Sequence, residues 1–451
     1  MLHAAVSNSP HGGDVLAVVA DEIAGNAVAD GTTAGDVWVW TTWSTWATAR
    51  HLSVGPASEA DIARFLTAHR HRWRGATMRN VVASINREHS RRGWPTPARH
   101  VVHRLLVSVE RLEGISITDP RPALLPVVAG KILVRLNDWQ PVPGALIGIV
   151  LIRRGVDLID VPAIDPACSR PTRIGWRIGT HKTGVSLRNA EASERSAGEA
   201  IAVLAANRTA IDTLNSLTNQ IWAAMERAGL PAAMSPHQLT ATIRGLSEDE
   251  FLWLVQWCDP TLARRMRNRA LIGVGVAAAR RGVELSRIDR DDITQLDQGW
   301  LCIFRQHKTA PNGDRPIERV VGHIGDDTDP CDATCPACAL GDWLALSDRR
   351  WPGRPSAAVF PSKLYRFRSP SGRLTAQGVR YIVRSACVGI DDVTVRLGSS
   401  SLRIGGATGA YLAGMDPVTI ALELTGHESL DHLPKYIRLQ LPEHNTYRLP
   451  L

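Results

Sequence analysis

The chain has 451 residues, of which 44% are hydrophobic and 21% charged, with a formal net charge of +8 and a pI near 9.4. This length predicts two or three domains, and the spread of basic residues favours an acidic partner, with nucleic acid ahead of a membrane surface. Seven cysteines without regular spacing argue against a disulfide framework, and the start carries no signal-peptide pattern. The longest apolar run, near "GALIGIVLI", is far shorter than the roughly 20 residues that span a bilayer, so we expect a soluble, cytoplasmic protein.

The N-terminal part divides into a lead-in and a helical domain. Residues 1–36 are small and Gly/Ala-rich, which predicts a flexible segment with one short helix at Val15–Ile23. Beyond it, Ser58 is placed to cap "EADIARFLTAHR", and a second helix is predicted from Gly75 to a stop at Gly93. We therefore expect a helical domain over residues 37–118.

The second of these helices has an apolar face and a basic face. The apolar face consists of Met78, Val81, Val82 and Ile85, and the arginines that lie mostly outside it are Arg79, Arg87, Arg91 and Arg92. On an isolated helix such a face is more often simply solvated. In a small and strongly basic helical domain we favour contact with DNA.

The middle of the chain resembles its C-terminal part. "ALIGIVLIRRGVDL" at residues 145–158 resembles "ALIGVGVAAARRGVEL" at residues 270–285, and each is followed by a tryptophan and then by "HKT". A weaker similarity follows: "LTNQ" resembles "LTAQ", and "SPHQLT" stands where the later copy has "SSSLRI". We interpret residues 119–244 as a degenerate, shortened repeat of a complete domain at 245–445, with a short tail at 446–451. The alternative is chance similarity in an Ala/Arg-rich chain.

The complete copy predicts helices around a few strands. "SEDEFLWLVQW" and "PTLARRMRNRALIGVGVAAARRGVEL" have the pattern of helices, and "DDITQLDQGWLCIFRQHKTAPNGDRPIERVV" that of strands joined by turns. The remainder is again expected to be helical. The predicted fold class is mainly α with a small antiparallel sheet (α+β).

Five residues of this copy follow the order of one catalytic set: Arg281, Lys308, Arg403, His427 and Tyr436, with Glu284 three residues after Arg281 as a residue of doubtful role. Lys308 stands at the end of a hairpin strand, and "GHESLDHLPKY" carries His427 and Tyr436 on a segment expected to be helical. The arrangement resembles the tyrosine recombinases, the phage-integrase family, whose set is Arg, a hairpin Lys, His-x-x-Arg, Gly-His or Gly-Trp, and Tyr. The similarity extends over residues 246–440, and residues 37–114 more loosely resemble the family's core-binding domain.

This resemblance implies cleavage and rejoining of DNA through a 3′-phosphotyrosine, without a metal, ATP or another cofactor. Arg281 and Arg403 would bind the non-bridging phosphate oxygens, because a guanidinium is planar, charged and bidentate. Lys308 would protonate the leaving 5′ oxygen, and His427 would donate a further hydrogen bond to the phosphate. Tyr436 would be the nucleophile.

One position departs from the family pattern. Ser400 stands three residues before Arg403, where the family has His or sometimes Lys, and serine alone is no base at neutral pH. In the upstream repeat the other residue of this pair is missing: His237 is present, but Thr240 stands where the arginine is expected. We expect this repeat to be catalytically dead and to contact DNA or another subunit.

Each residue of the set also has an ordinary explanation. Arg281 and Lys308 could be surface residues, Glu284 only a partner of Arg281, His427 a helix-capping residue and Tyr436 a core aromatic. The alternative function is a catalytically impaired DNA-binding accessory protein, because of Ser400. A third is relaxation of the type IB topoisomerase kind.

The expected partners follow from the same resemblance. They are double-stranded DNA, further copies of this chain in a homo-tetramer on two DNA sites, and DNA-bending helper proteins. No membrane partner is expected.

A cysteine cluster invites a second hypothesis. Cys331, Cys335 and Cys338, preceded by His323, match a Cys₃His zinc site, which is closed and tetrahedral. However, "CPACALGDWL" also resembles the start of an ordinary helix in the family, and a single CxxC is weak evidence. At this stage we assign no metal.

Overall fold

The computed structural model describes residues 30–437 apart from these positions: 74, 98–99, 113–121, 173–174, 181–184, 187–212, 308–312, 314, 326–329, 354–357, 365–370, 391–396, 427–429, 431–432 and 434–435. The chain forms two compact units, residues 1–120 and 121–451. The helix predicted at Val15–Ile23 lies outside the described residues.

The described residues of the first unit form four helices: α2 (Asp30–Thr48), α3 (Glu59–His69), α4 (Gly75–Arg91) and α5 (His100–Leu112). Helix α3 begins as predicted, since Ser58 Oγ accepts a hydrogen bond from the Asp61 N–H at 3.1 Å. The predicted apolar face of α4 is buried and joins a core that contains Trp43 and Phe65. The helical nature of this region therefore follows from its apolar periodicity.

The start of this unit was predicted too late. Residues 30–36 were expected to be part of a flexible lead-in, but α2 already includes them. Asp36 is only 5% exposed and accepts two hydrogen bonds from Arg87 of α4, at 2.9 Å from Nε and 2.6 Å from Nη2. This contact between distant residues supports a helix that local Gly and Thr composition does not favour.

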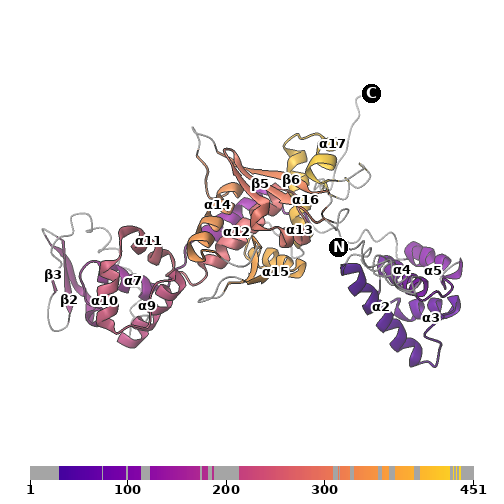
Figure 1. Ribbon diagram of the computed structural model, residues 1–451, viewed down its shortest axis with the longest axis horizontal. Helices are drawn as coiled ribbons and strands as arrows, with labels where there is room; N and C mark the ends of the chain where they lie inside the picture. The colour runs from indigo at the N-terminus through magenta and orange to yellow at the C-terminus, as the bar shows by residue number, and fades with distance from the viewer. Residues whose placement is uncertain are drawn as a thin grey trace, which may run out of the picture. The chain divides into compact units, whose positions relative to one another are not determined.

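The second unit contains the remaining elements (Figure 1). Its helices are α6 (Pro126–Asn137), α7 (Pro143–Arg153), η1 (Leu158–Ala163), α9 (Leu214–Ala228), α10 (Pro236–Gly245), α11 (Glu248–Gln256), α12 (Leu262–Ala277), α13 (Gly282–Arg287), η3 (Arg290–Asp292), α14 (Pro336–Arg350), α15 (Ala376–Ala386), α16 (Ser399–Leu412), α17 (Pro417–Thr419) and η4 (Ile420–Leu424). Its strands are β1 (Ile164–Thr172), β2 (Gly175–Thr180), β3 (Val185–Ser186), β4 (Ile293–Leu296), β5 (Gly299–Phe304), β6 (Ile317–Gly322), β7 (Pro361–Lys363) and β8 (Ser371–Arg373).

Three small antiparallel sheets accompany these helices. Their strand orders are β1-β2-β3, β4-β5-β6 and β7-β8. The fold is thus mainly helical with small antiparallel sheets, as predicted, although the β7–β8 pair was not foreseen. Among the described residues, no helix is long and apolar enough to cross a membrane.

Two sets of elements in this unit follow the same order. The first runs α7, η1, β1-β2-β3, α9 and α10, and the second runs α12, α13, β4-β5-β6, α15 and α16. η1 packs against α9 and α10 as α13 packs against α15 and α16. In Figure 1, α7, α9 and α10 gather beside β2 and β3, and α12, α13 and α16 gather beside β5 and β6. Helix α14 has no counterpart among the described residues of the first set.

The predicted boundary between residues 244 and 245 does not match the packing. Helix α6, assigned to the upstream repeat, packs against α12 and α16, and the Leu124 N–H donates to the Ser401 carbonyl oxygen at 3.0 Å. Conversely α11, assigned to the later copy, packs against α9, where Trp253 Nε1 donates to the Ala228 oxygen at 2.9 Å. An apolar helix face shows that a partner is needed, but it does not identify the partner.

Helix α16 is held close to its neighbours by two glycines of "LRIGGATG". A Cβ at Gly405 would lie 1.8 Å from the Leu124 oxygen, and one at Gly406 would lie 2.2 Å from the Val276 oxygen. Both approaches involve backbone atoms, so no larger residue fits without a shift of the chain. The glycines thereby fix the position of the helix that carries Arg403.

Candidate active site

Arg281 directly precedes α13 and is tied to Glu284 twice. Its backbone N–H donates to Glu284 Oε2 at 3.1 Å, and its Nη1 donates to Oε1 at 3.0 Å. The i, i+3 spacing at a helix start allows a side chain to reach back to the backbone in this way. The guanidinium is therefore oriented by a fixed carboxylate.

Glu284 lies among three arginines and is 1% exposed. Burial acts to raise the pKa of Glu284, but the charges of Arg280, Arg403 and Arg281 outweigh it and hold that pKa below its usual value. Arg280 Nη1 lies 3.7 Å from Glu284 Oε2 and is fully buried. Glu284 thus remains a carboxylate that partly neutralises a concentrated positive charge.

Arg403 of α16 is also 1% exposed. Its guanidinium donates to the carbonyl oxygens of Thr425 and Ala279, the latter at 3.4 Å. Burial, followed by the charge of Arg281, lowers the pKa of Arg403 to about 10, so the group stays charged at neutral pH. The guanidinium carbon lies 5.0 Å from the centre of the Tyr436 ring, within the range of a cation–π contact.

Tyr436 brings the two arginines together. Its Oη accepts a hydrogen bond from Arg281 Nη2 at 3.1 Å, and its backbone oxygen accepts one from Thr408 Oγ1 at 2.9 Å. Burial acts to raise the pKa of Tyr436, but the charges and hydrogen bonds of Arg281 and Arg403 outweigh it, so the pKa lies below its usual value. Two sequence-distant cations therefore favour the phenolate.

The helix expected around Tyr436 lies largely outside the described residues. Tyr436 lies in a turn, where its N–H donates to the Leu433 oxygen at 2.8 Å. Upstream, η4 ends at Leu424, and Gly426 adopts a φ of +65°, which favours glycine and interrupts a helix. Pro434, two residues before the tyrosine, cannot donate a backbone hydrogen bond.

The remaining predicted site residues divide into two groups. Ser400 lies in α16, one turn before Arg403, and is partly exposed. Lys308 and His427 lie outside the described residues. Their described neighbours are His307, whose Nε2 is 2.7 Å from the Arg315 oxygen, and Gly426.

Two residues near the site were not predicted. Arg280 pairs with Glu284 and donates to the Leu424 oxygen, and Thr408 fixes the backbone at Tyr436. The sequence held no clear signal for the first, since the adjacent arginines Arg91 and Arg92 are both exposed. The sequence held no signal for Thr408, whose partner lies 28 residues away.

The predicted DNA-contacting arginines of α4 all lie on its exposed face. Arg87 is engaged by Asp36, as described above, and Arg91 and Arg92 pair with Glu88 at 2.6 and 2.7 Å. The Arg92 guanidinium also lies 4.8 Å from the centre of the Trp40 ring. These pairs orient the basic face, and Arg87 has a clear structural role besides.

The three cysteines and the histidine named above are brought together in space. One ligand atom of each residue lies within 4.8 Å of those of the other three: His323, Cys331, Cys335 and Cys338. This cluster shares no residue with the Arg–Glu–Tyr group.

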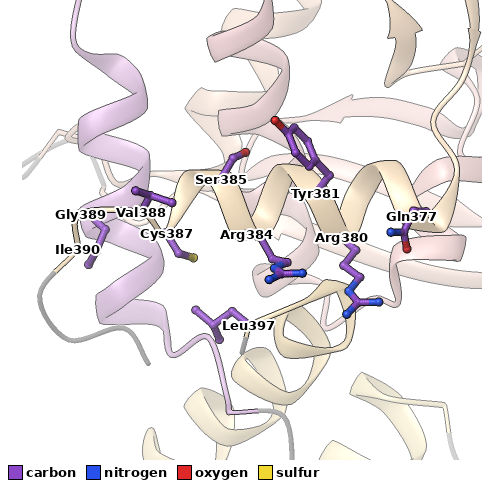
Figure 2. Close-up of a pocket in the computed structure, with 10 residues that line it drawn as sticks. All are labelled: Gln377, Arg380, Tyr381, Arg384, Ser385, Cys387, Val388, Gly389, Ile390 and Leu397. Atoms are coloured by element: carbon purple, nitrogen blue, oxygen red, sulfur yellow. The ribbon is translucent and has the colours of Figure 1, made fainter. Parts of the chain in front are cut away.

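A hollow on the outer face of α15 is a second surface feature (Figure 2). Its volume is about 630 Å³, and Arg380, Tyr381 and Arg384 are among its lining residues. None of the candidate catalytic residues lines it.

Comparisons with known proteins give a likeness of fold. No family model and no curated protein matches the sequence. Among solved structures, the chain is similar to XerH site-specific recombinase bound to palindromic difH substrate in a post-cleavage complex, with 20% identity and a TM-score of 0.30, covering 39% of this chain and 42% of that one. It is also similar to XerH bound to difH in a pre-cleavage complex (16%, 0.31, 50% and 49%) and to XerA recombinase (19%, 0.30, 45% and 69%).

The matched structures are thus recombinases, and the chain spans about half or less of the two XerH chains. A likeness at this level describes the fold. The functional proposal below depends on the residues of the site.

The buried carboxylate gives a first testable prediction. Glu284→Gln is expected to lower the free energy of unfolding by about 3 kcal/mol, because Arg280 would keep a buried charge without its carboxylate. Urea denaturation at neutral pH measures this loss. Because the pKa of Glu284 is held low, its contribution is present at neutral pH and disappears only as the pH falls through that lowered pKa.

Glu318→Gln, on the exposed side of β6, is the matched control and should change stability by less than about 0.5 kcal/mol. Equal effects of the two substitutions would show that Glu284 does not neutralise the arginines.

Proposed function

We propose that this chain is a site-specific DNA recombinase that breaks and rejoins DNA through a phosphotyrosine. The observation that carries the proposal is the contact of Tyr436 with both Arg281 and Arg403, which come from two separate helices. A structural tyrosine needs one hydrogen-bond partner, whereas two arginines around a phenol also supply what a phosphodiester transition state requires.

In the proposed reaction, Tyr436 loses its phenolic proton to water, its Oη attacks the phosphorus, and the bond from phosphorus to the 5′ oxygen breaks. Arg281 and Arg403 hold the two non-bridging oxygens, where negative charge accumulates. Lys308 gives its proton to the departing 5′ oxygen, and His427 hydrogen-bonds the phosphate, as the family resemblance implies. The phosphate ester is conserved in the protein–DNA link, so the reverse step needs no ATP.

The arginine contacts also describe a resting state. The Tyr436 ring lies over the guanidinium of Arg403, which is 1% exposed. DNA binding would then require the ring to move aside, so that a phosphate takes its place between Arg281 and Arg403. In this proposal the tyrosine protects the anion site until a substrate arrives.

A trapped covalent complex is the direct test. The full chain is incubated with duplexes from the DNA flanking its own gene, each nicked near the presumed crossover so that the cleaved end diffuses away. A covalent adduct that survives denaturant supports the proposal. Binding without any adduct at every native site would favour the second candidate, an accessory protein impaired by Ser400.

We further propose that the predicted repeat at residues 119–244, from the start of α7 onward, is a duplicated and catalytically dead copy of part of the catalytic domain. The shared order of elements and the shared packing of η1 and α13 support this. Thr240 takes the place of the arginine and has a structural role, since its Oγ1 accepts from the Leu158 N–H at 3.2 Å. The copy would contact DNA or a neighbouring protomer.

Arg154→Ala combined with Lys182→Ala tests this. We expect adduct formation to change by less than about threefold, because neither residue would touch the reacting phosphate. Arg281→Ala serves as the positive control for loss. If the double variant binds DNA normally but cannot cleave it, the first copy is catalytic and the proposal is wrong.

The basic face of α4 is proposed to contact the DNA backbone through Arg79, Arg91 and Arg92. Phosphate contacts of this kind give affinity without sequence preference and weaken as salt rises. Arg87 is set apart, because Asp36 holds it within the helical unit.

The full assembly would be a homo-tetramer on two DNA sites, with DNA-bending helpers.

A further inference from the structure

The cysteine and histidine cluster at the end of β6 comes from two separate elements. His323 follows β6 directly, and its N–H donates to the Gln298 oxygen at 2.9 Å. Cys335 is the N-cap of α14, and Cys338 lies in the first turn of that helix. Capping of a helix explains the position of Cys335 alone. It does not explain why the other three residues lie beside it.

The distances within the cluster are those of a metal site. His323 Nδ1 lies 3.4 Å from Cys331 Sγ, 3.7 Å from Cys335 Sγ and 3.5 Å from Cys338 Sγ. Zinc bonds of about 2.3 Å to sulfur and about 2.0 Å to nitrogen, at tetrahedral angles, place those atoms about 3.5 Å apart. One nitrogen within 3.7 Å of three sulfurs has no counterpart in a disulfide, which joins two sulfurs only.

Two backbone N–H groups also lie within hydrogen-bonding distance of the cysteine sulfurs. The Gly325 N–H lies 3.3 Å from Cys331 Sγ, and the Cys338 N–H lies 3.4 Å from Cys335 Sγ. Such donors stabilise thiolate ligands and orient them toward a metal. Cys335 is fully buried, while Cys331 and Cys338 are partly exposed, so an ion can enter from solvent.

We propose that His323, Cys331, Cys335 and Cys338 bind one structural zinc ion. Three thiolates and one imidazole fill the tetrahedron, so no position remains open for a substrate. The ion fastens the end of β6 to the start of α14, which packs along α12. It thereby braces the three-stranded sheet whose β5–β6 connection contains Lys308.

Zinc content is the first measurement. The full chain is produced without a His-tag in zinc-supplemented medium, and metal is measured by mass spectrometry after extensive dialysis. Wild type is expected to hold about one zinc per chain, and Cys338→Ser well under half of that. Cys387→Ser, a buried cysteine outside the cluster, is the matched control and should keep its zinc.

Cobalt(II) and heat provide readouts that need no DNA. Replacement of zinc by cobalt should give the intense visible bands of a tetrahedral ion and a thiolate charge-transfer band, both absent in Cys338→Ser. A strong chelator should lower the Tm of wild type by on the order of 10 °C and leave Cys338→Ser unchanged. Three results would overturn the proposal. They are a wild-type zinc content no higher than that of Cys338→Ser, weak octahedral cobalt bands in wild type, and a Cys331–Cys338 disulfide in freshly purified protein.

Discussion

Tyr436→Phe is expected to abolish the covalent DNA adduct, with a fall of at least about 1,000-fold in trapped complex. Phenylalanine keeps the aromatic ring over Arg403 and removes only the oxygen that would bond to phosphorus. The hydrogen bond from Arg281 is lost too, at a cost of about 1 kcal/mol, so the protein should remain folded. Denaturing gels with labelled nicked duplexes measure the adduct, and a mobility-shift assay measures binding.

Tyr411→Phe, near the end of α16, is the matched control and should cleave like wild type. DNA binding should be the same in all three proteins. If Tyr436→Phe forms as much adduct as wild type, another residue is the nucleophile and the proposed mechanism fails. If wild type binds its native sites but forms no adduct, the accessory-protein alternative is favoured.

The arrangement of the site follows unevenly from the sequence. Arg281, Glu284, Arg403 and Tyr436 could be chosen by their order and spacing, and the structure places them in one group. Their chemistry depends on residue type, which sequence records directly. Tyr436 itself lies in a turn, which the glycine and proline upstream of it favour over a continuous helix.

Packing partners were much harder to predict. Helix α6 has an apolar face that suits any neighbour, and nothing in its sequence identifies α12 and α16 as the helices it packs against. The sequence pattern alone is weak evidence for a metal site for a similar reason. The CxxC spacing does not reveal that His323, from the end of a strand, lies within 3.7 Å of all three sulfurs.

The position of Ser400 gives the second large prediction. Ser400→His is expected to speed cleavage by about 100-fold near neutral pH, because an imidazole one turn before Arg403 can accept the proton of Tyr436. In wild type, Arg281 and Arg403 lower the pKa of Tyr436 and substitute in part for a base. Single-turnover cleavage over a pH series measures the effect.

The pH dependence separates these two routes. Wild-type cleavage should rise with pH as the phenolate fraction of Tyr436 grows toward its lowered pKa. An imidazole is a base only above its own pKa, about 6.5, so the advantage of Ser400→His should vanish below that pH. It should also shrink at alkaline pH, where the tyrosine loses its proton unaided. Ser400→Asn occupies similar space without a base, so its cleavage rate should match that of wild type at every pH. If Ser400→Asn gains as much rate as Ser400→His, the histidine acts through packing. Proton removal from Tyr436 then does not limit the reaction.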